Sequence, residues 1–144
     1  MTLKFLLDTS IVSAPLAKIT DPDVLRQLDA NAHKCAIASV VWHELVFGCR
    51  RLPQGRRRLA LETYLSDVVK TAFPILPYDE QAASWHGLER ARLEALGTPT
   101  PYADAQIAAV AHVNDLALVT LNVKDFNRFK DLEVLDWTKR KRRH

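Results

Sequence analysis

With 144 residues, a formal net charge of +3 and 48% hydrophobic residues, the chain has the composition of one globular domain and is neither disordered nor fibrous. No apolar run approaches the roughly 20 residues that span a bilayer, and Asp8 interrupts the first apolar run too early for a signal peptide. Cys35 and Cys49 share no short metal-binding spacing, which favours a reducing cytoplasm over a disulfide framework.

The first predicted element is a buried strand over residues 4–7, followed at once by Asp8, Thr9 and Ser10. Thr9 or Ser10 is expected to cap a short helix that breaks near Pro15. Since ligands of open parallel sheets bind outside the carboxyl ends of the strands, Asp8 is positioned for chemistry rather than for packing. The simpler alternative is that Asp8 only caps a turn.

Strands and helices then alternate. Asp21 and Pro22 start a helix, residues 35–38 form a second strand, and Ser39 is expected to cap a helix over residues 40–48 that carries Glu44. A helix from Arg56 to about Lys70 completes a hairpin with arginines at its tip. A short strand over 73–77 and a helix over 80–96 follow, capped by Asp79 and ended by Gly97. Arg90 and Arg92 of that helix are expected to face solvent.

The last part of the chain repeats the pattern. An alanine-rich helix over residues 103–111 carries Asp104 in its first turn, and residues 116–120 form the clearest strand. Thr120, Asn122 and Asp125 gather at the end of that strand, and residues 133–137 form a last one. The alternation predicts an α/β fold, a three-layer α/β/α sandwich with a mostly parallel central sheet. We expect one domain over residues 1–138 and a basic tail over 139–144.

Basic residues are concentrated rather than spread. The segments 50–51, 56–58 and 139–143 hold half of the 20 lysines and arginines. Such clusters suit a polyanionic partner, and a solvated surface is the simpler alternative.

Four acids, Asp8, Glu44, Asp104 and Asp125, are each predicted at a strand end or in the first turns of a helix. In a parallel sheet these places share one edge. Two carboxylates about 4 Å apart repel by about 4 kcal/mol at an effective dielectric of 20, so converging acids need cations. Hard oxygen ligands select Mg²⁺ or Mn²⁺, and no His/Cys spacing supports zinc. An acidic metal site near arginines suits phosphodiester hydrolysis.

Four segments in order, Leu-Leu-Asp-Thr-Ser, His-Glu-Leu-Val-Phe-Gly, Ala-Asp-Ala-Gln-Ile-Ala-Ala and Val-Thr-Leu-Asn-Val-Lys-Asp-Phe, resemble the motifs of PIN-domain ribonucleases. The Arg-Leu-Pro-Gln-Gly-Arg-Arg-Arg segment and the closing Asp-Trp resemble the VapC toxin branch. The resemblance covers nearly the whole chain.

The resemblance implies a Mg²⁺- or Mn²⁺-dependent endoribonuclease in which Asp8, Glu44 and Asp104 match the family's acidic triad. The family's fourth acid stands at either of two positions, and this chain has Asn122 at the first and Asp125 at the second. We expect Asp8 and Asp104 to bind metal directly and Glu44 to bind it through water or to orient the attacking water. Asp125 would complete the acidic shell.

Thr120 and Asn122 are expected to position ligands or the phosphate. The resemblance also implies a toxin of a type II toxin–antitoxin pair, inhibited by a VapB-like antitoxin, commonly dimeric, and touching operator DNA only through the antitoxin complex. The RNA substrate could be transfer, ribosomal or messenger RNA.

Two alternatives stay open. A phosphohydrolase or phospho-acceptor domain also places an aspartate after its first strand, and Thr120 and Lys124 fit that pattern. Against it, position 10 is Ser rather than a second acid, no acidic pair precedes Asp8, and Glu44 would have no role. A non-catalytic interaction module with vestigial acids is the other alternative.

Overall fold

The computed structural model describes residues 2–138, so the predicted basic tail over 139–144 lies outside the described residues. Five strands form one parallel sheet in the order β3-β2-β1-β4-β5. The strands are β1 (Phe5–Leu7), β2 (Cys35–Ala38), β3 (Ile75–Leu76), β4 (Ala117–Val119) and β5 (Val134–Leu135). Leu7 pairs with Val119, so Asp8 and Thr120 leave the sheet at the same level.

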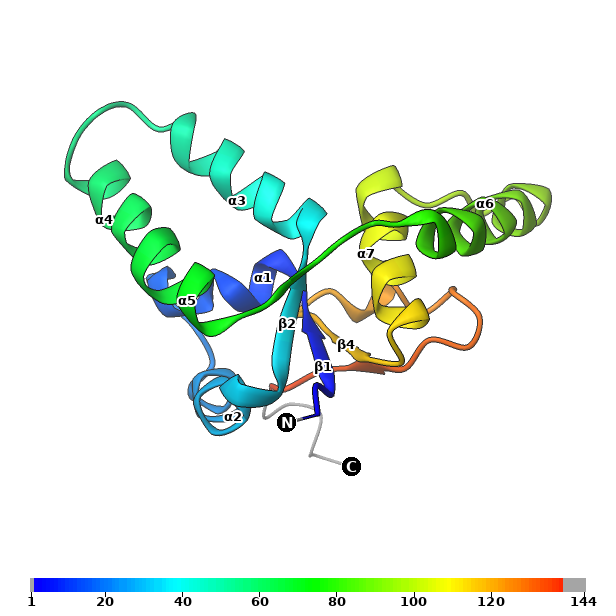
Figure 1. The fold of residues 1–144 in the computed structure, drawn as a ribbon, viewed down its shortest axis with the longest axis horizontal. Helices are drawn as coiled ribbons and strands as arrows, with labels where there is room; N and C mark the ends of the chain where they lie inside the picture. Colours follow the sequence, from blue (N-terminus) through cyan, green and yellow to red (C-terminus); the bar gives the residue numbers. More distant parts are fainter. Residues whose placement is uncertain (1, 139–144) are drawn as a thin grey trace.

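Helices cover both faces of this sheet, which confirms the predicted α/β/α sandwich (Figure 1). The chain moves one way along the sheet from β1 to β3 and the other way from β3 to β5. Because the crossovers between parallel strands are right-handed, the helices of these two parts lie on opposite faces of the sheet. One face carries α1 (Thr9–Val12), η1 (Ala14–Leu16), α2 (Pro22–Asn31), η2 (Ala32–Lys34), α3 (Ser39–Arg50), α4 (Arg56–Tyr64), η3 (Leu65–Val69) and α5 (Lys70–Ala72). The other face carries α6 (Glu80–Ala95) and α7 (Tyr102–Val113), and η4 (Val123–Asp125) follows β4.

The core lies between these layers and explains the sequence pattern of the strands. Leu6, Ile37 and Leu118 are fully buried on neighbouring strands, as expected for parallel strands covered on both faces. Residues 107–111 of α7 are buried as well. The alanines among them let this helix approach the sheet closely.

Two caps lie one or two residues earlier than predicted. Asp8, rather than Thr9 or Ser10, precedes α1 in an extended conformation and accepts the backbone N–H of Thr9. Ala38 likewise stays extended, so Ser39 is the first helical residue of α3 rather than its cap. In both places the helix starts directly at the end of a strand. Asp8 can therefore cap α1 and still present a carboxylate oxygen to its other neighbours.

The other boundaries agree closely with the sequence. Asp21 and Asp79 cap α2 and α6 through their carboxylates, to the N–H groups of Asp23 and Ala82. Gly97 ends α6 with φ of 75°, and its N–H and that of Thr98 bond back to the last turn. This is the Schellman arrangement that glycine favours. The predicted helix from Arg56 continues through the π-helical turn η3 to Ala72.

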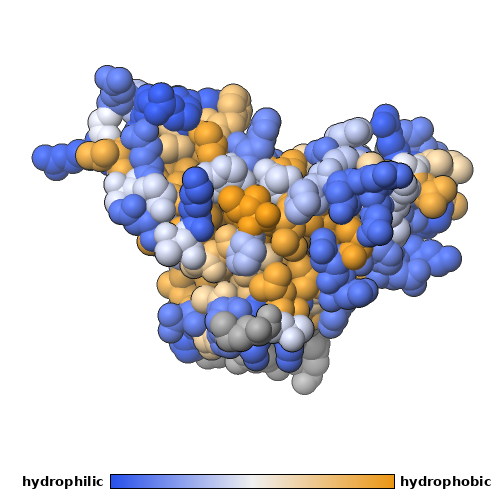
Figure 2. Space-filling view, viewed as in Figure 1, coloured by the Kyte–Doolittle hydropathy of each residue, from blue (hydrophilic) through white to orange (hydrophobic). Residues whose placement is uncertain are grey.

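Two helical arms rise beside the carboxyl edge of the sheet. The α3–α5 hairpin forms one arm and α6 with α7 forms the other (Figure 1). The outline of the molecule is indented between them in the space-filling view (Figure 2). Within residues 2–138, none of the helices combines the length and apolar character needed to cross a membrane.

Candidate active site

Asp8 lies at the centre of the carboxyl edge of the sheet, at the end of β1, and is only 8% exposed. One carboxylate oxygen, Oδ1, accepts the Thr9 N–H at 2.8 Å. The other, Oδ2, accepts the Thr120 hydroxyl at 2.8 Å and the Ser10 hydroxyl at 3.3 Å. These donors fix the orientation of the carboxylate, and each hydrogen bond to a charged group contributes about 1.5–3 kcal/mol.

Glu44 reaches the same edge from α3. Its Oε1 atom accepts the Thr9 hydroxyl at 2.8 Å, while the Thr9 backbone N–H is bonded to Asp8. Thr9 therefore contacts two of the four predicted acids at once. The sequence indicated Thr9 only as a possible cap, and its hydroxyl contact with Glu44 is a feature that local sequence could not reveal.

Asp104 and Asp125 also belong to this edge. Burial, followed by the charges of Asp8, Asp125 and Glu44, raises the pKa of Asp104 from 3.8 to about 6. The Asp104 carboxylate is thus close enough to all three other acids to be repelled by them. The four acids are brought together as the sequence predicted, although Asp125 lies in the exposed 3₁₀ turn η4.

Thr120 and Asn122 follow β4, and their contacts differ. The buried Thr120 hydroxyl donates to Asp8 and accepts the Asn122 backbone N–H at 3.0 Å. The Asn122 side chain is exposed and makes no hydrogen bond with other residues in the range 2–138. Thr120 holds Asp8 directly, and Asn122 acts on it only through its backbone. Ser10 adds a second link, because its hydroxyl accepts the Leu121 N–H at 3.1 Å.

The donor set fits a hard divalent cation better than a soft one. Within residues 2–138, the side chains that bond to or repel these acids are carboxylates and hydroxyls and include no His or Cys, which suits Mg²⁺ or Mn²⁺ rather than zinc. Across the described part of the chain, no three His, Cys, Asp or Glu side chains are close enough to form a ready cage. Mg²⁺ commonly takes one or two carboxylates and completes its shell with waters and substrate phosphate. The pKa of Asp104 is raised by burial and by the neighbouring carboxylates, and a cation bound beside it would stabilise the charged form against both.

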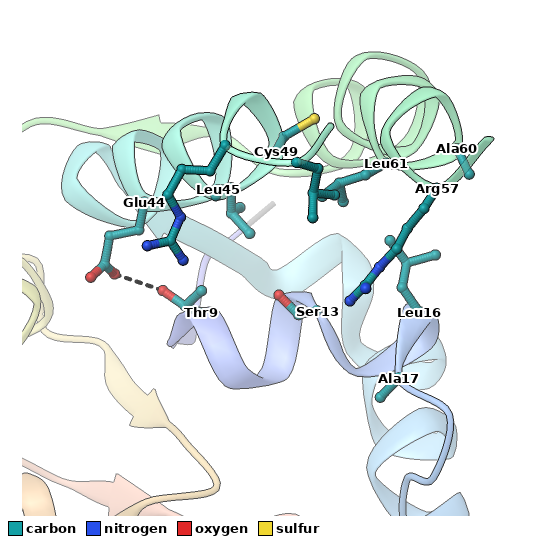
Figure 3. Close-up of a pocket in the computed structure, with 13 residues that line it drawn as sticks. Thr9, Ser13, Leu16, Ala17, Glu44, Leu45, Cys49, Arg57, Ala60 and Leu61 are labelled. Atoms are coloured by element: carbon teal, nitrogen blue, oxygen red, sulfur yellow. Dashed lines mark hydrogen bonds between the residues drawn. The ribbon is translucent and has the colours of Figure 1, made fainter. Parts of the chain in front are cut away.

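A groove leads away from Glu44 between α1 and the α3–α4 hairpin (Figure 3). It has a volume of about 540 Å³ and a mainly apolar floor that includes Leu45 and Leu61. Glu44 lies at one end, and Arg57 lies at the other, near Leu16 and Ala17. Among the arginines of the hairpin, Arg51 and Arg57 line the groove that begins at Glu44, and Arg57 lies at its far end.

Other arginines are engaged in the scaffold. Arg50 of α3 contacts Glu62 of α4 at 3.0 Å and so joins the two helices. Arg58 lies 3.9 Å from the same carboxylate within α4. Arg92, predicted to face solvent, is held by two 2.8 Å bonds to the buried Glu89. The prediction was wrong because helical periodicity does not show that the loop after η4 packs against this part of α6, where the Lys130 N–H also bonds to Glu89.

Comparison with known proteins agrees with this geometry. The PIN domain family matches residues 5–132. The tRNA(fMet)-specific endonuclease VapC of Shigella flexneri is 34% identical over 137 residues, covering 94% of this chain and 99% of that protein. Ribonuclease VapC2 of Haemophilus influenzae is 31% identical over 136 residues, covering 94% and 98%.

Solved structures show the same fold. FitAcB from Neisseria gonorrhoeae matches with a TM-score of 0.85 and 27% identity over 92% of this chain and 97% of that one. DNA-bound VapBC from Salmonella typhimurium matches with a TM-score of 0.79 and 29% identity over 94% and 99%. Family, curated relatives and fold all agree with the motif order of the sequence: the chain belongs to the PIN-domain family, among the VapC-type ribonucleases.

Proposed function

We propose that this chain is the toxin of a type II toxin–antitoxin pair and acts as a Mg²⁺- or Mn²⁺-dependent endoribonuclease. The observation that carries the proposal is the meeting of Asp8, Glu44, Asp104 and Asp125 at one edge of a PIN-domain sheet. The relative from Shigella flexneri is named a tRNA(fMet)-specific endonuclease, so tRNA(fMet) is the first substrate to test, before ribosomal and messenger RNA.

In this proposal each acid has a distinct role. Asp8 and Asp104 hold the metal directly, and Thr120 keeps Asp8 oriented toward it. Glu44, fixed by Thr9, orients the attacking water, and Asp125 completes the acidic shell. The bound cation lowers the pKa of water and offsets negative charge on the phosphate. Asn122, at the exposed rim, is positioned to contact the phosphate of the substrate.

The partners follow from the same relatives. Structures of related VapBC and FitAB proteins are described as complexes, some with DNA. We propose a VapB-like antitoxin for this chain, contact with operator DNA only through that complex, a homodimeric toxin, and action in the cytoplasm. Arg57 is the proposed contact for the RNA backbone, because it lines the groove that starts at Glu44.

The test is cleavage of RNA by the purified protein with and without Mn²⁺ or Mg²⁺. A second experiment maps the cut sites in cellular RNA by 5′-end sequencing after brief induction of the protein. Asp8→Asn should abolish cleavage and keep the fold, checked by far-UV circular dichroism. Full activity of Asp8→Asn would refute the assignment. A phosphoenzyme trapped by acid quench would favour the phosphohydrolase alternative, and no Mn²⁺ binding by calorimetry would favour a vestigial site.

A further inference from the structure

A second cavity shares Glu44 with the acid cluster and has no role in the metal site described above. Its volume is about 530 Å³, within the range of small-ligand sites. Its lining comes from the start of α3, the segment before α6 and the start of α7: Ser39, Val40, His43, Glu44, Tyr78, Tyr102, Ala103 and Gln106. Because Glu44 both lines this cavity and belongs to the acid cluster, the cavity directly adjoins the proposed centre of cleavage.

The two tyrosines of this cavity are held from behind by α6. The Tyr78 hydroxyl is hydrogen-bonded to Nδ1 of His86 at 2.7 Å. The His86 ring meets the Tyr102 ring edge-on, with centroids 4.8 Å apart. The Arg90 guanidinium lies 5.5 Å from the Tyr102 ring centroid, a cation–π distance. We call Tyr78, His86 and Tyr102 the aromatic network.

His86 supports this network as a neutral group. It is 3% exposed, and burial, followed by the charge of Arg90, lowers its pKa. Burial, followed by the neighbouring Tyr102 hydroxyl, raises the pKa of Tyr78. Both shifts keep the bonded pair uncharged near neutral pH, so the hydrogen bond positions Tyr78 without bringing a charge to the cavity wall.

Although it is held from behind, Tyr102 leaves 55% of its surface exposed. A large aromatic side chain fixed by neighbours and open on the other side loses little conformational entropy when a flat ligand stacks on it. The exposed His43 imidazole, the Gln106 amide and the Ser39 hydroxyl add hydrogen-bonding groups to the same lining. A flat, polar-edged ring is the chemical class that such a surface recognises.

We propose that this cavity binds one unpaired nucleobase of the RNA, adjacent to the scissile phosphate. The inference rests on the proposed nuclease function and names a subsite of it. Glu44 would repel a phosphate placed in the cavity, whereas a neutral base can sit beside that carboxylate. Unpaired RNA bases are commonly bound by stacking on Tyr or His and by hydrogen bonds to their edges. Tyr102 is then the stacking surface and Gln106 a reader of the base edge.

The test is an abasic scan. The probes are fluorescein-labelled single-stranded RNAs of about twelve nucleotides. Each probe contains one abasic nucleotide, at a different position in each RNA. The probes are titrated with the protein in EDTA, so that no cleavage occurs. For the parent protein, one position should weaken binding by about 5- to 150-fold, the range expected for one stacked base. In Tyr102→Leu that position should lose its effect, and Tyr102→Phe should keep it. Leu88→Ala, at an exposed site of α6, is the control and should behave as the parent.

The inference is overturned if the abasic penalty is the same in Tyr102→Leu and the parent, or if no position shows a penalty. It is also overturned if Tyr102→Leu changes the sedimentation coefficient, because the surface would then be an interface between copies. Failure of the nuclease proposal has a different signature, absence of metal-dependent cleavage by the parent protein. A parent that cuts RNA but shows no position-dependent penalty would lose only the base subsite.

Discussion

Thr9 donates its side-chain hydroxyl to Glu44 with 2.8 Å between Oγ1 and Oε1, although the two residues are 35 positions apart in sequence. The backbone N–H of the same residue is bonded to Asp8. Thr9 thus sets the relative positions of two acids from different elements. Without the hydroxyl, the half-buried Glu44 would keep its charge and lose its only hydrogen bond found within residues 2–138.

Thr9→Val, which removes the hydroxyl and keeps the shape, should slow RNA cleavage about tenfold or more. A hydrogen bond to a charged group contributes about 1.5–3 kcal/mol, and about 1.4 kcal/mol corresponds to a factor of ten. Thr9→Ser should retain most of the activity because it retains the hydroxyl. The measurement is the single-turnover rate at saturating Mn²⁺. Equal rates for Thr9→Val and Thr9→Ser would show that the contact has no role in cleavage.

Asp104→Asn should change the pH dependence of stability of the metal-free protein. The pKa of Asp104 is raised from 3.8 to about 6, so the folded state binds this proton more tightly than the unfolded state. The free energy of unfolding of the parent should therefore fall as pH rises from about 4 to about 6, and Asp104→Asn should remove that part of the decline.

At neutral pH in EDTA the Asn variant should consequently melt a few degrees higher than the parent, since it lacks a charge that is disfavoured by burial and by the neighbouring acids. Mn²⁺ should raise the melting temperature of the parent more than that of the variant. Thermal unfolding followed by circular dichroism across this pH range is the measurement. Asp29→Asn, an exposed acid on α2, is the control, and an identical profile for Asp104→Asn and the parent would contradict the repulsion.

Arg57→Gln should weaken RNA binding and lower its salt dependence. Arg57 lines the groove that begins at Glu44, whereas Arg50 and Arg58 contact Glu62. One phosphate contact contributes about 0.7 to the slope of log affinity against log salt for a single strand. Fluorescence anisotropy of labelled RNA in EDTA at several salt concentrations measures both the affinity and this slope. Lys4→Gln makes the same charge change at the amino end of β1, and an equal loss in that variant would indicate a general effect of net charge.

Glu89→Gln should destabilise the fold without touching the acid cluster. Glu89 is 6% exposed, accepts two bonds from Arg92 and accepts the backbone N–H of Lys130. Breaking a fully buried pair costs about 3–5 kcal/mol. The Arg92 side chain is 35% exposed, and water screens it, so we expect a loss of about 2 kcal/mol.

Urea unfolding measures this loss, and the same helix supplies a matched control. The Arg90–Glu94 pair has side chains 59% and 56% exposed, so Glu94→Gln should change stability by no more than about 0.5 kcal/mol. If the two variants lose equal stability, the hydrogen bonds of Glu89 to Arg92 and Lys130 do not stabilise the fold as described.

The sequence by itself determined the layered α/β fold and the placement of each acid near the carboxyl edge of the sheet. Apolar runs identify the buried strands, as at Cys35–Ala38, and Asp79 with Gly97 marks the ends of α6. These signals are local, because a strand needs burial over a few residues and a helix needs caps within one turn. That the acids share one edge then follows from the topology of a parallel sheet.

Only the tertiary structure decided which side chains meet across that edge. The Thr9 contact with Glu44, the Ser10 link to Leu121 and the pairing of Arg92 with Glu89 all join distant segments. The same is true of Tyr78 and Tyr102, which share a cavity. Hydrogen bonds and stacking depend on ångström-scale geometry between elements, and that geometry is set by how the layers pack rather than by the pattern within any one segment.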